Sequence, residues 1–114
     1  MHITDTLLET ARADSDLLIK NDKLGDDLSK AREVTFLLIA PSKKKAELVA
    51  SFVDDNRYGA ARVKRSGAQY GIYVAINMPI EQNVLASVSG FMACLAEIFG
   101  IKYDGWESDV QRVA

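Results

Sequence analysis

The sequence predicts an α+β domain in which two helices cover one face of a four-stranded antiparallel sheet. One observation is a short apolar stretch, residues 33–40, rich in β-branched residues. A second is the alternation of apolar and polar residues over 60–65 and 69–77. The third is an apolar helical stretch that stops at Gly100 and runs at once into residues 101–106. In order, residues 33–106 give strand, helix, strand, strand, helix, strand, which is the ferredoxin-like βαββαβ sandwich.

The bulk composition is that of an ordinary globular protein. The chain has 114 residues, 48% hydrophobic and 26% charged, enough for one domain. No apolar run approaches the roughly 20 residues that cross a bilayer, and the first residues lack a signal pattern, so we expect a cytoplasmic protein. We divide the chain into a helix and connector (1–29), the ferredoxin-like domain (30–107) and a tail (108–114).

An extra helix is predicted over residues 3–20, ahead of the sheet. Its apolar stripe is weak in the middle, so a break or fraying is expected near Asp14. It should cover part of the other face of the sheet, or an edge. In the connector 21–30, Gly25 is expected to have a positive φ. The apolar positions of the helix are Ile3, Leu7, Leu8, Ala11, Leu17 and Leu18.

Residues 33–40 are apolar almost throughout, which favours a central strand. Pro41 ends this strand. Ser42 is a candidate N-cap for a helix that runs to about residue 55. The inward positions expected of that helix are Ala46, Val49, Ala50 and Val53.

Residues 60–65 and 69–77 are predicted to form a hairpin with a tight connection between them. Because side chains alternate along a strand, Tyr70 and Tyr73 fall on opposite faces. Three charges on the outer strand, Arg62, Lys64 and Arg65, discourage further pairing at that edge.

A long helix is predicted over residues 79–99. Gly90 weakens it by about 1 kcal/mol relative to alanine and indicates a close crossing over the sheet. Cys94, the only cysteine, lies on its apolar face, where a small buried hydrophobe is expected and no internal disulfide is possible. The inward positions expected are Ile80, Val84, Val88, Phe91, Leu95 and Ile98.

The net charge of −2 conceals three segments of different sign. Residues 1–29 carry −4, residues 30–66 carry +5, and the remainder carries −3. These are either three solvated surfaces that happen to differ, or a basic face over the middle of the domain that meets an acidic partner. The basic side chains of such a face would be Lys43, Lys44, Lys45, Arg62, Lys64 and Arg65.

The groups that carry chemistry are few. His2 is the only histidine and lies at a terminus, and Cys94 has no histidine nearby in sequence. No CxxC pair, HExxH, P-loop or GxGxxG run is present. Asp26 and Asp27 are adjacent acids in a turn, which bind a cation less often than they cap and face solvent. We therefore expect that the protein is not an enzyme and that it holds no metal and no cofactor.

Direct RNA binding is the alternative from another class, because ferredoxin-like sheets include RNA-recognition domains. Those stack bases on paired aromatic residues of the central strands. Here the first central strand offers only Phe36, and Tyr70 and Tyr73 face opposite ways. A basic hairpin without such a pair favours a protein partner, with a small RNA-binding module as the alternative.

Four stretches occur together in order: residues 24–28 (LGDDL) before a strand, residues 34–40 entering a helix through Pro41, Gly59 after that helix, and residues 95–106, which end in YDGW. Together they resemble the family of regulators of ribonuclease E activity, type B, over residues 20–107. The resemblance implies a ferredoxin-like fold and a non-enzymatic protein that binds ribonuclease E and inhibits its processing of transcripts.

The YDGW tetrapeptide has a structural and a functional interpretation. Structurally, Tyr103 and Trp106 supply apolar surface, Asp104 accepts backbone hydrogen bonds at a turn, and Gly105 permits that turn. Functionally, two aromatic residues and a carboxylate at a sheet margin would anchor a protein partner. Neither interpretation makes them catalytic.

Overall fold

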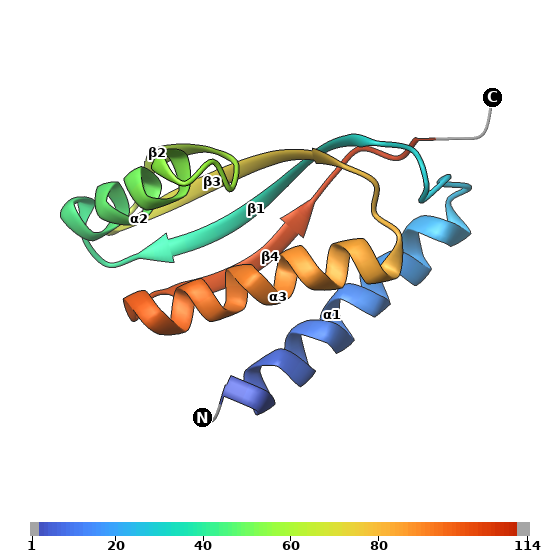
Figure 1. Cartoon of the computed structure of the whole chain (residues 1–114), viewed down its shortest axis with the longest axis horizontal. Coiled ribbons are helices and arrows are strands. Elements are labelled where there is room, and N and C mark those ends of the chain that lie inside the picture. The colour runs from blue at the N-terminus through green and yellow to red at the C-terminus, as the bar shows by residue number, and fades with distance from the viewer. Residues whose placement is uncertain (1–2, 112–114) are drawn as a thin grey trace.

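The structure, a computed structural model, describes residues 3–111 of the chain (Figure 1). Its elements follow the predicted order, so the α+β class and the additional N-terminal helix are confirmed. The elements are α1 (Ile3–Lys23), β1 (Arg32–Ala40), α2 (Lys43–Asp55), β2 (Ala60–Ser66), β3 (Gln69–Met78), α3 (Gln82–Phe99) and β4 (Lys102–Glu107).

The four strands form one antiparallel sheet in the order β2-β3-β1-β4, which is the ferredoxin-like order. β4 pairs with β1, placing Phe36 opposite Trp106 and Leu38 opposite Tyr103, so the predicted closing strand is confirmed. A β-bulge lies between these two pairs. Since Tyr103 and Trp106 are three residues apart, the bulge allows both to face the same side as their partners.

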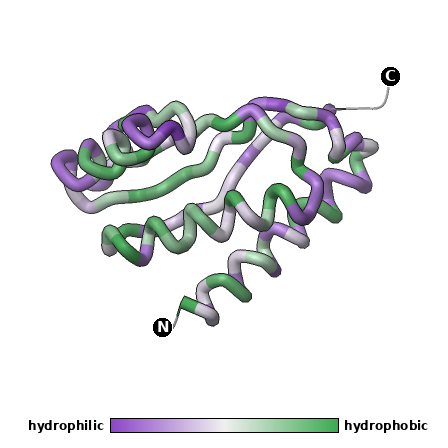
Figure 2. The backbone as a smooth tube through the Cα atoms, viewed as in Figure 1, coloured by the Kyte–Doolittle hydropathy of each residue, from purple (hydrophilic) through white to green (hydrophobic). Residues whose placement is uncertain are grey.

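The two faces of the sheet differ sharply in burial. Along β1, Val34, Phe36 and Leu38 are fully buried, whereas the alternate residues Thr35 and Leu37 are only partly buried. α2 and α3 cover the buried face, and Figure 2 shows hydrophobic residues concentrated along β1 and α3. Among the described residues no helix covers the other face, which we call the open face.

The first helix lies beside α3 and reaches the edge strand β4 (Figure 1). The expectation that α1 lies at an edge of the sheet is therefore met at β4, whereas the alternative, that it covers the other face, is not. α1 continues without a break through Asp14, which is 5% exposed. The close approach predicted at Gly90 is not found, because a Cβ there would lie 3.7 Å from Leu7 Cδ2 of α1, an ordinary contact distance. The expected crossing over the sheet at this glycine is therefore wrong.

The predicted caps are confirmed. Ser42 accepts a hydrogen bond from the backbone N–H of Lys45 at 3.2 Å and begins α2. α3 ends at Gly100, whose φ of 67° is left-handed, and Gly25 has the expected positive φ of 83°. α3 begins later than predicted, at Gln82 rather than residue 79.

The inward side of α3 was predicted only in part: of the expected positions, Ile80 just before the helix and Leu95 within it are buried. Its buried residues are Leu85, Ser89, Met92, Ala93, Leu95 and Ala96. Of the residues expected to point inward, Val84, Val88 and Phe91 are only partly buried and Ile98 is 78% exposed. The reason is that apolar residues occupy two adjacent faces of this helix, so periodicity alone does not select the buried one.

By length and composition α3 could cross a membrane, contrary to the expectation that no apolar run approaches that length. Core helices of soluble proteins can have the same length and composition. Here α3 packs on α1, β1 and β4, and its residues Leu85 and Met92 are fully buried in the protein core.

Candidate functional site

The two aromatic residues of the YDGW tetrapeptide point into the helical layer. Trp106 Nε1 donates a hydrogen bond to Asp14 Oδ1 of α1 at 3.0 Å. The hydroxyl groups of Tyr103 and Ser89, which lies on α3, share a hydrogen bond at 2.7 Å. Trp106 is only 9% exposed. The tetrapeptide thus joins the edge of the sheet to both neighbouring helices.

The carboxyl group of Asp14 is the unusual member of this cluster. Burial raises its pKa, although the Ser89 hydroxyl and the Trp106 indole beside it act in the opposite direction. Its Oδ2 atom is buried and has no hydrogen-bond partner among the described residues. Burial likewise raises the pKa of Tyr103, with the Asp14 charge adding to the effect. This cluster holds the fold together and presents no accessible reactive group.

Asp104 is the exposed residue of the tetrapeptide, and Gly105 beside it is partly buried. Asp104 Oδ1 lies 3.9 Å from Lys102 Nζ at the surface, in place of the backbone hydrogen bonds expected for it. Gly105 has φ 90°, a conformation that suits glycine, and it lies at the bulge of β4. Of the three proposed anchor residues of YDGW, only Asp104 is presented to solvent.

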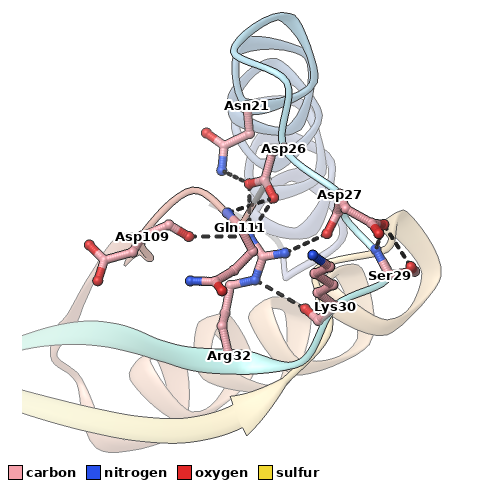
Figure 3. A network of polar contacts seen from close by, with 8 residues as sticks. All are labelled: Asn21, Asp26, Asp27, Ser29, Lys30, Arg32, Asp109 and Gln111. Carbon is pink, nitrogen blue, oxygen red and sulfur yellow. Dashed lines mark hydrogen bonds and ion pairs between the residues drawn. The ribbon is translucent and has the colours of Figure 1, made fainter. Parts of the chain in front are cut away.

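A second polar cluster joins the connector after α1 to β1 (Figure 3). Arg32 Nη1 lies 2.7 Å from Asp26 Oδ2, and both side chains are almost fully buried. The same guanidinium donates to the carbonyl groups of Asp27, Lys30 and Asp109. The segment 109–111 is held at the start of β1 by the bond from Arg32 to the Asp109 carbonyl and by the bond from the Gln111 N–H to Asp26 Oδ1.

Asp26 and Asp27 therefore have different roles. Burial would raise the pKa of Asp26, but hydrogen bonds from Arg32, the Gln111 backbone and Asn21 outweigh it and lower the pKa. Asp27 accepts hydrogen bonds from the backbone N–H and the hydroxyl of Ser29, as a turn cap does. Because Asp26 is only 6% exposed, the expectation that this acid faces solvent is wrong.

The predicted basic residues lie near one end of the molecule but on different faces. Arg62 pairs with Tyr73 and Lys64 with Gly71, which places both on the open face. Arg65 lies on the alternate side of β2 and donates to the Gly67 carbonyl at 3.1 Å. The end of β1 leads through Ser42 into the α2 lysines Lys43, Lys44 and Lys45, of which Lys43 lies 3.8 Å from Glu47.

One basic residue was missed. Lys102 on β4 pairs with Ile39 of β1 and lies at the same end of the open face as Lys64. Sequence reasoning passed over it because its segment carries a net negative charge. The pairing register, which the sequence alone does not give, is what groups it with the β2 cations.

A partly exposed aromatic cluster lies between α2 and α3. Phe52 and Phe99 have ring centroids 5.5 Å apart, and Tyr58 and Phe91 have theirs 4.7 Å apart. All large hydrophobic side chains that are exposed in residues 3–111 belong to helices or the turns after them, and none to a strand. We define the aromatic surface as these four rings together with Leu48 and Ile98.

The remaining candidates show no reactive arrangement. Cys94 is a free thiol and only partly buried, so the expectation of a fully buried residue is not met. His2 lies outside the described residues. Within residues 3–111 no group of three or more His, Cys, Asp and Glu side chains could hold a metal ion.

Fold and site together define a ferredoxin-like α+β domain with an added helix, whose polar clusters serve its own packing. The chain belongs to the regulator of ribonuclease activity B family, whose model matches residues 11–108. A comparison with curated proteins finds no relative that matches. The matched range begins within α1 and ends just beyond β4, so it includes Asp14 and Trp106.

Proposed function

We propose that this protein is a non-enzymatic regulator that binds an endoribonuclease such as ribonuclease E and inhibits its cleavage of RNA by protein contact. The family supports a role in regulating ribonuclease activity. The observation that carries the contact mechanism is the aromatic surface, on which Phe52 is 36%, Tyr58 44% and Ile98 78% exposed. Exposed aromatic side chains grouped in this way are typical of interface hot spots.

Positive charge borders this surface. Lys45, Leu48 and Phe52 are three and four residues apart on α2, so they share one flank of the helix. Lys44 is exposed and Lys45 is partly buried. Lysines beside an apolar centre favour a partner segment that presents acidic residues beside its own apolar anchor, and their charge speeds association with such a segment.

The experiment measures cleavage of a labelled RNA by purified ribonuclease E with increasing amounts of this protein. We expect saturable inhibition, and capture of the nuclease that survives prior digestion of RNA. Ile98→Asp should weaken inhibition about tenfold or more, as loss of a hot spot does. Leu8→Asp is the matched control, because Leu8 is 71% exposed but lies on α1.

Three results would count against the proposal. Inhibition could be absent, the captured nuclease could be lost after RNA digestion, or Leu8→Asp could weaken inhibition as much as Ile98→Asp does. RNA cleavage by this protein without added nuclease would show that it is an enzyme.

A further inference from the structure

The open face of the sheet presents cations from both edge strands around one aromatic ring. The pairing register places Arg62 of β2 beside Tyr73, and Tyr73 beside Leu37 on β1. In the neighbouring row, Lys64 and Lys102 lie at opposite edges. Arg62, Lys64 and Lys102 are all exposed, and Lys102 Nζ also lies 3.9 Å from Asp104 Oδ1 in a surface ion pair.

The Tyr73 ring lies against the sheet where a side chain on residue 71 would be. A Cβ on Gly71 would fall 2.9 Å from Tyr73 Cε2 and 3.4 Å from Leu37 Cδ1. The glycine therefore makes room for a ring held close to the strands, and Tyr73 remains only partly buried. An aromatic ring in this position is a platform on which a planar ligand can stack.

A depression of about 360 Å³ adjoins this ring. Its lining includes Thr35, Leu37, Asp104 and Glu107. Carboxylates accept hydrogen bonds from the exocyclic amine of cytosine, whereas uracil presents a carbonyl oxygen there. The depression thus combines the ring of Tyr73 with two residues, Asp104 and Glu107, whose carboxylates can accept hydrogen bonds.

We propose that the open face binds single-stranded RNA, with a base stacked on Tyr73 and the phosphates near Arg62, Lys64 and Lys102. An acidic protein segment would also be attracted by the cations, and Asp104 and Glu107 repel its carboxylates as they repel phosphates, but only a nucleic acid also stacks a base on Tyr73. A nucleobase gains from the same two carboxylates. The aromatic surface lies on the opposite, helical side of the sheet, so this proposal stands apart from nuclease binding.

The test measures fluorescence anisotropy of labelled single-stranded RNA of about ten nucleotides, as oligo(C) and as oligo(U). We expect saturable binding that is tighter for oligo(C). Tyr73→Leu should lower affinity about fivefold or more because the stacking ring is lost, while Tyr73→Phe should bind nearly as the wild type does. Both variants are first compared with the wild type by thermal unfolding.

The cations are tested with the double variant Arg62→Glu, Lys64→Glu. Its slope of log affinity against log salt concentration should be shallower by roughly 0.7 for each phosphate contact removed. Lys20→Glu, Lys23→Glu, which makes the same charge change on α1, should leave the slope unchanged. The proposal is overturned if RNA does not bind, if Tyr73→Leu binds as well as Tyr73→Phe, or if both double variants act alike. It is also overturned if polyglutamate binds the open face and RNA does not.

Discussion

The indole of Trp106 and the carboxyl group of Asp14 join β4 to α1 through a buried hydrogen bond of 3.0 Å. Trp106→Phe keeps an aromatic ring but leaves Asp14 buried without this donor. We expect the free energy of unfolding to fall by about 1–3 kcal/mol, the desolvation cost of an unsatisfied buried group. Urea denaturation measures it. An unchanged midpoint would show that the hydrogen bond contributes nothing.

Asp14 should also make stability depend on pH. Its pKa is raised in the folded protein from the usual 3.8, so the folded state binds more protons than the unfolded state above that value. Stability therefore falls as pH rises through this window and then levels off. Asp14→Asn removes the titration, and its stability relative to the wild type should grow over the same window. Urea denaturation at a series of pH values tests this, and a constant difference would contradict it.

Asp26 should contribute with the opposite sign. Its pKa is lowered in the folded protein, so its stabilisation is present above the usual value of 3.8 and is lost as pH falls through the folded pKa. Arg32→Met would leave a buried carboxylate unpaired, at a cost of about 3–5 kcal/mol near neutral pH. Denaturation at neutral and at acidic pH should show that this cost shrinks in acid. A cost that is independent of pH would mean that Arg32 acts only through the three carbonyl groups it binds.

The order of elements was predictable because each strand and helix carries its own local signal. The alternation over 69–77 and the apolar run over 33–40 identified the central strands, and Ser42 and Gly100 marked helix ends. These signals depend on neighbours in sequence, which is why they succeeded. The pairing of β4 with β1 followed once the topology was correct, but the register that places Phe36 opposite Trp106 did not.

The long-range polar contacts were not predictable. Asp14 lies 92 residues from Trp106 in sequence, and an aspartate in a weak part of a helical stripe suggests a break rather than a buried acceptor. Arg32 similarly looked like one more charge of a basic segment. The buried face of α3 was identified only in part, at Leu95, because apolar residues such as Phe91 and Ile98 form a second face, which became the aromatic surface.

Gly105 tests the backbone of the tetrapeptide separately from its side chains. Its φ is 90°, and a Cβ there would have no heavy atom within 4 Å. Gly105→Ala should therefore destabilise the protein by about 1–3 kcal/mol through backbone strain alone. Gly67→Asn is the control, because φ 61° is a conformation that asparagine tolerates. Thermal unfolding compares the two, and equal melting temperatures would argue against strain at the bulge.

Reversing the charge of two lysines at the start of α2 should change stability and binding in opposite directions. A helix N-terminus disfavours positive charge, and the first turn of α2 contains no acid. Lys44→Glu, Lys45→Glu should therefore raise the free energy of unfolding by roughly 0.3–1 kcal/mol for each change. If these lysines steer an acidic partner, the same variant should inhibit ribonuclease E less and associate with it more slowly. Lys43 is left in place so that its contact with Glu47 is kept. If the variant is more stable and still inhibits as well as the wild type does, these lysines do not belong to the interface. Loss of folded protein could not explain such a result.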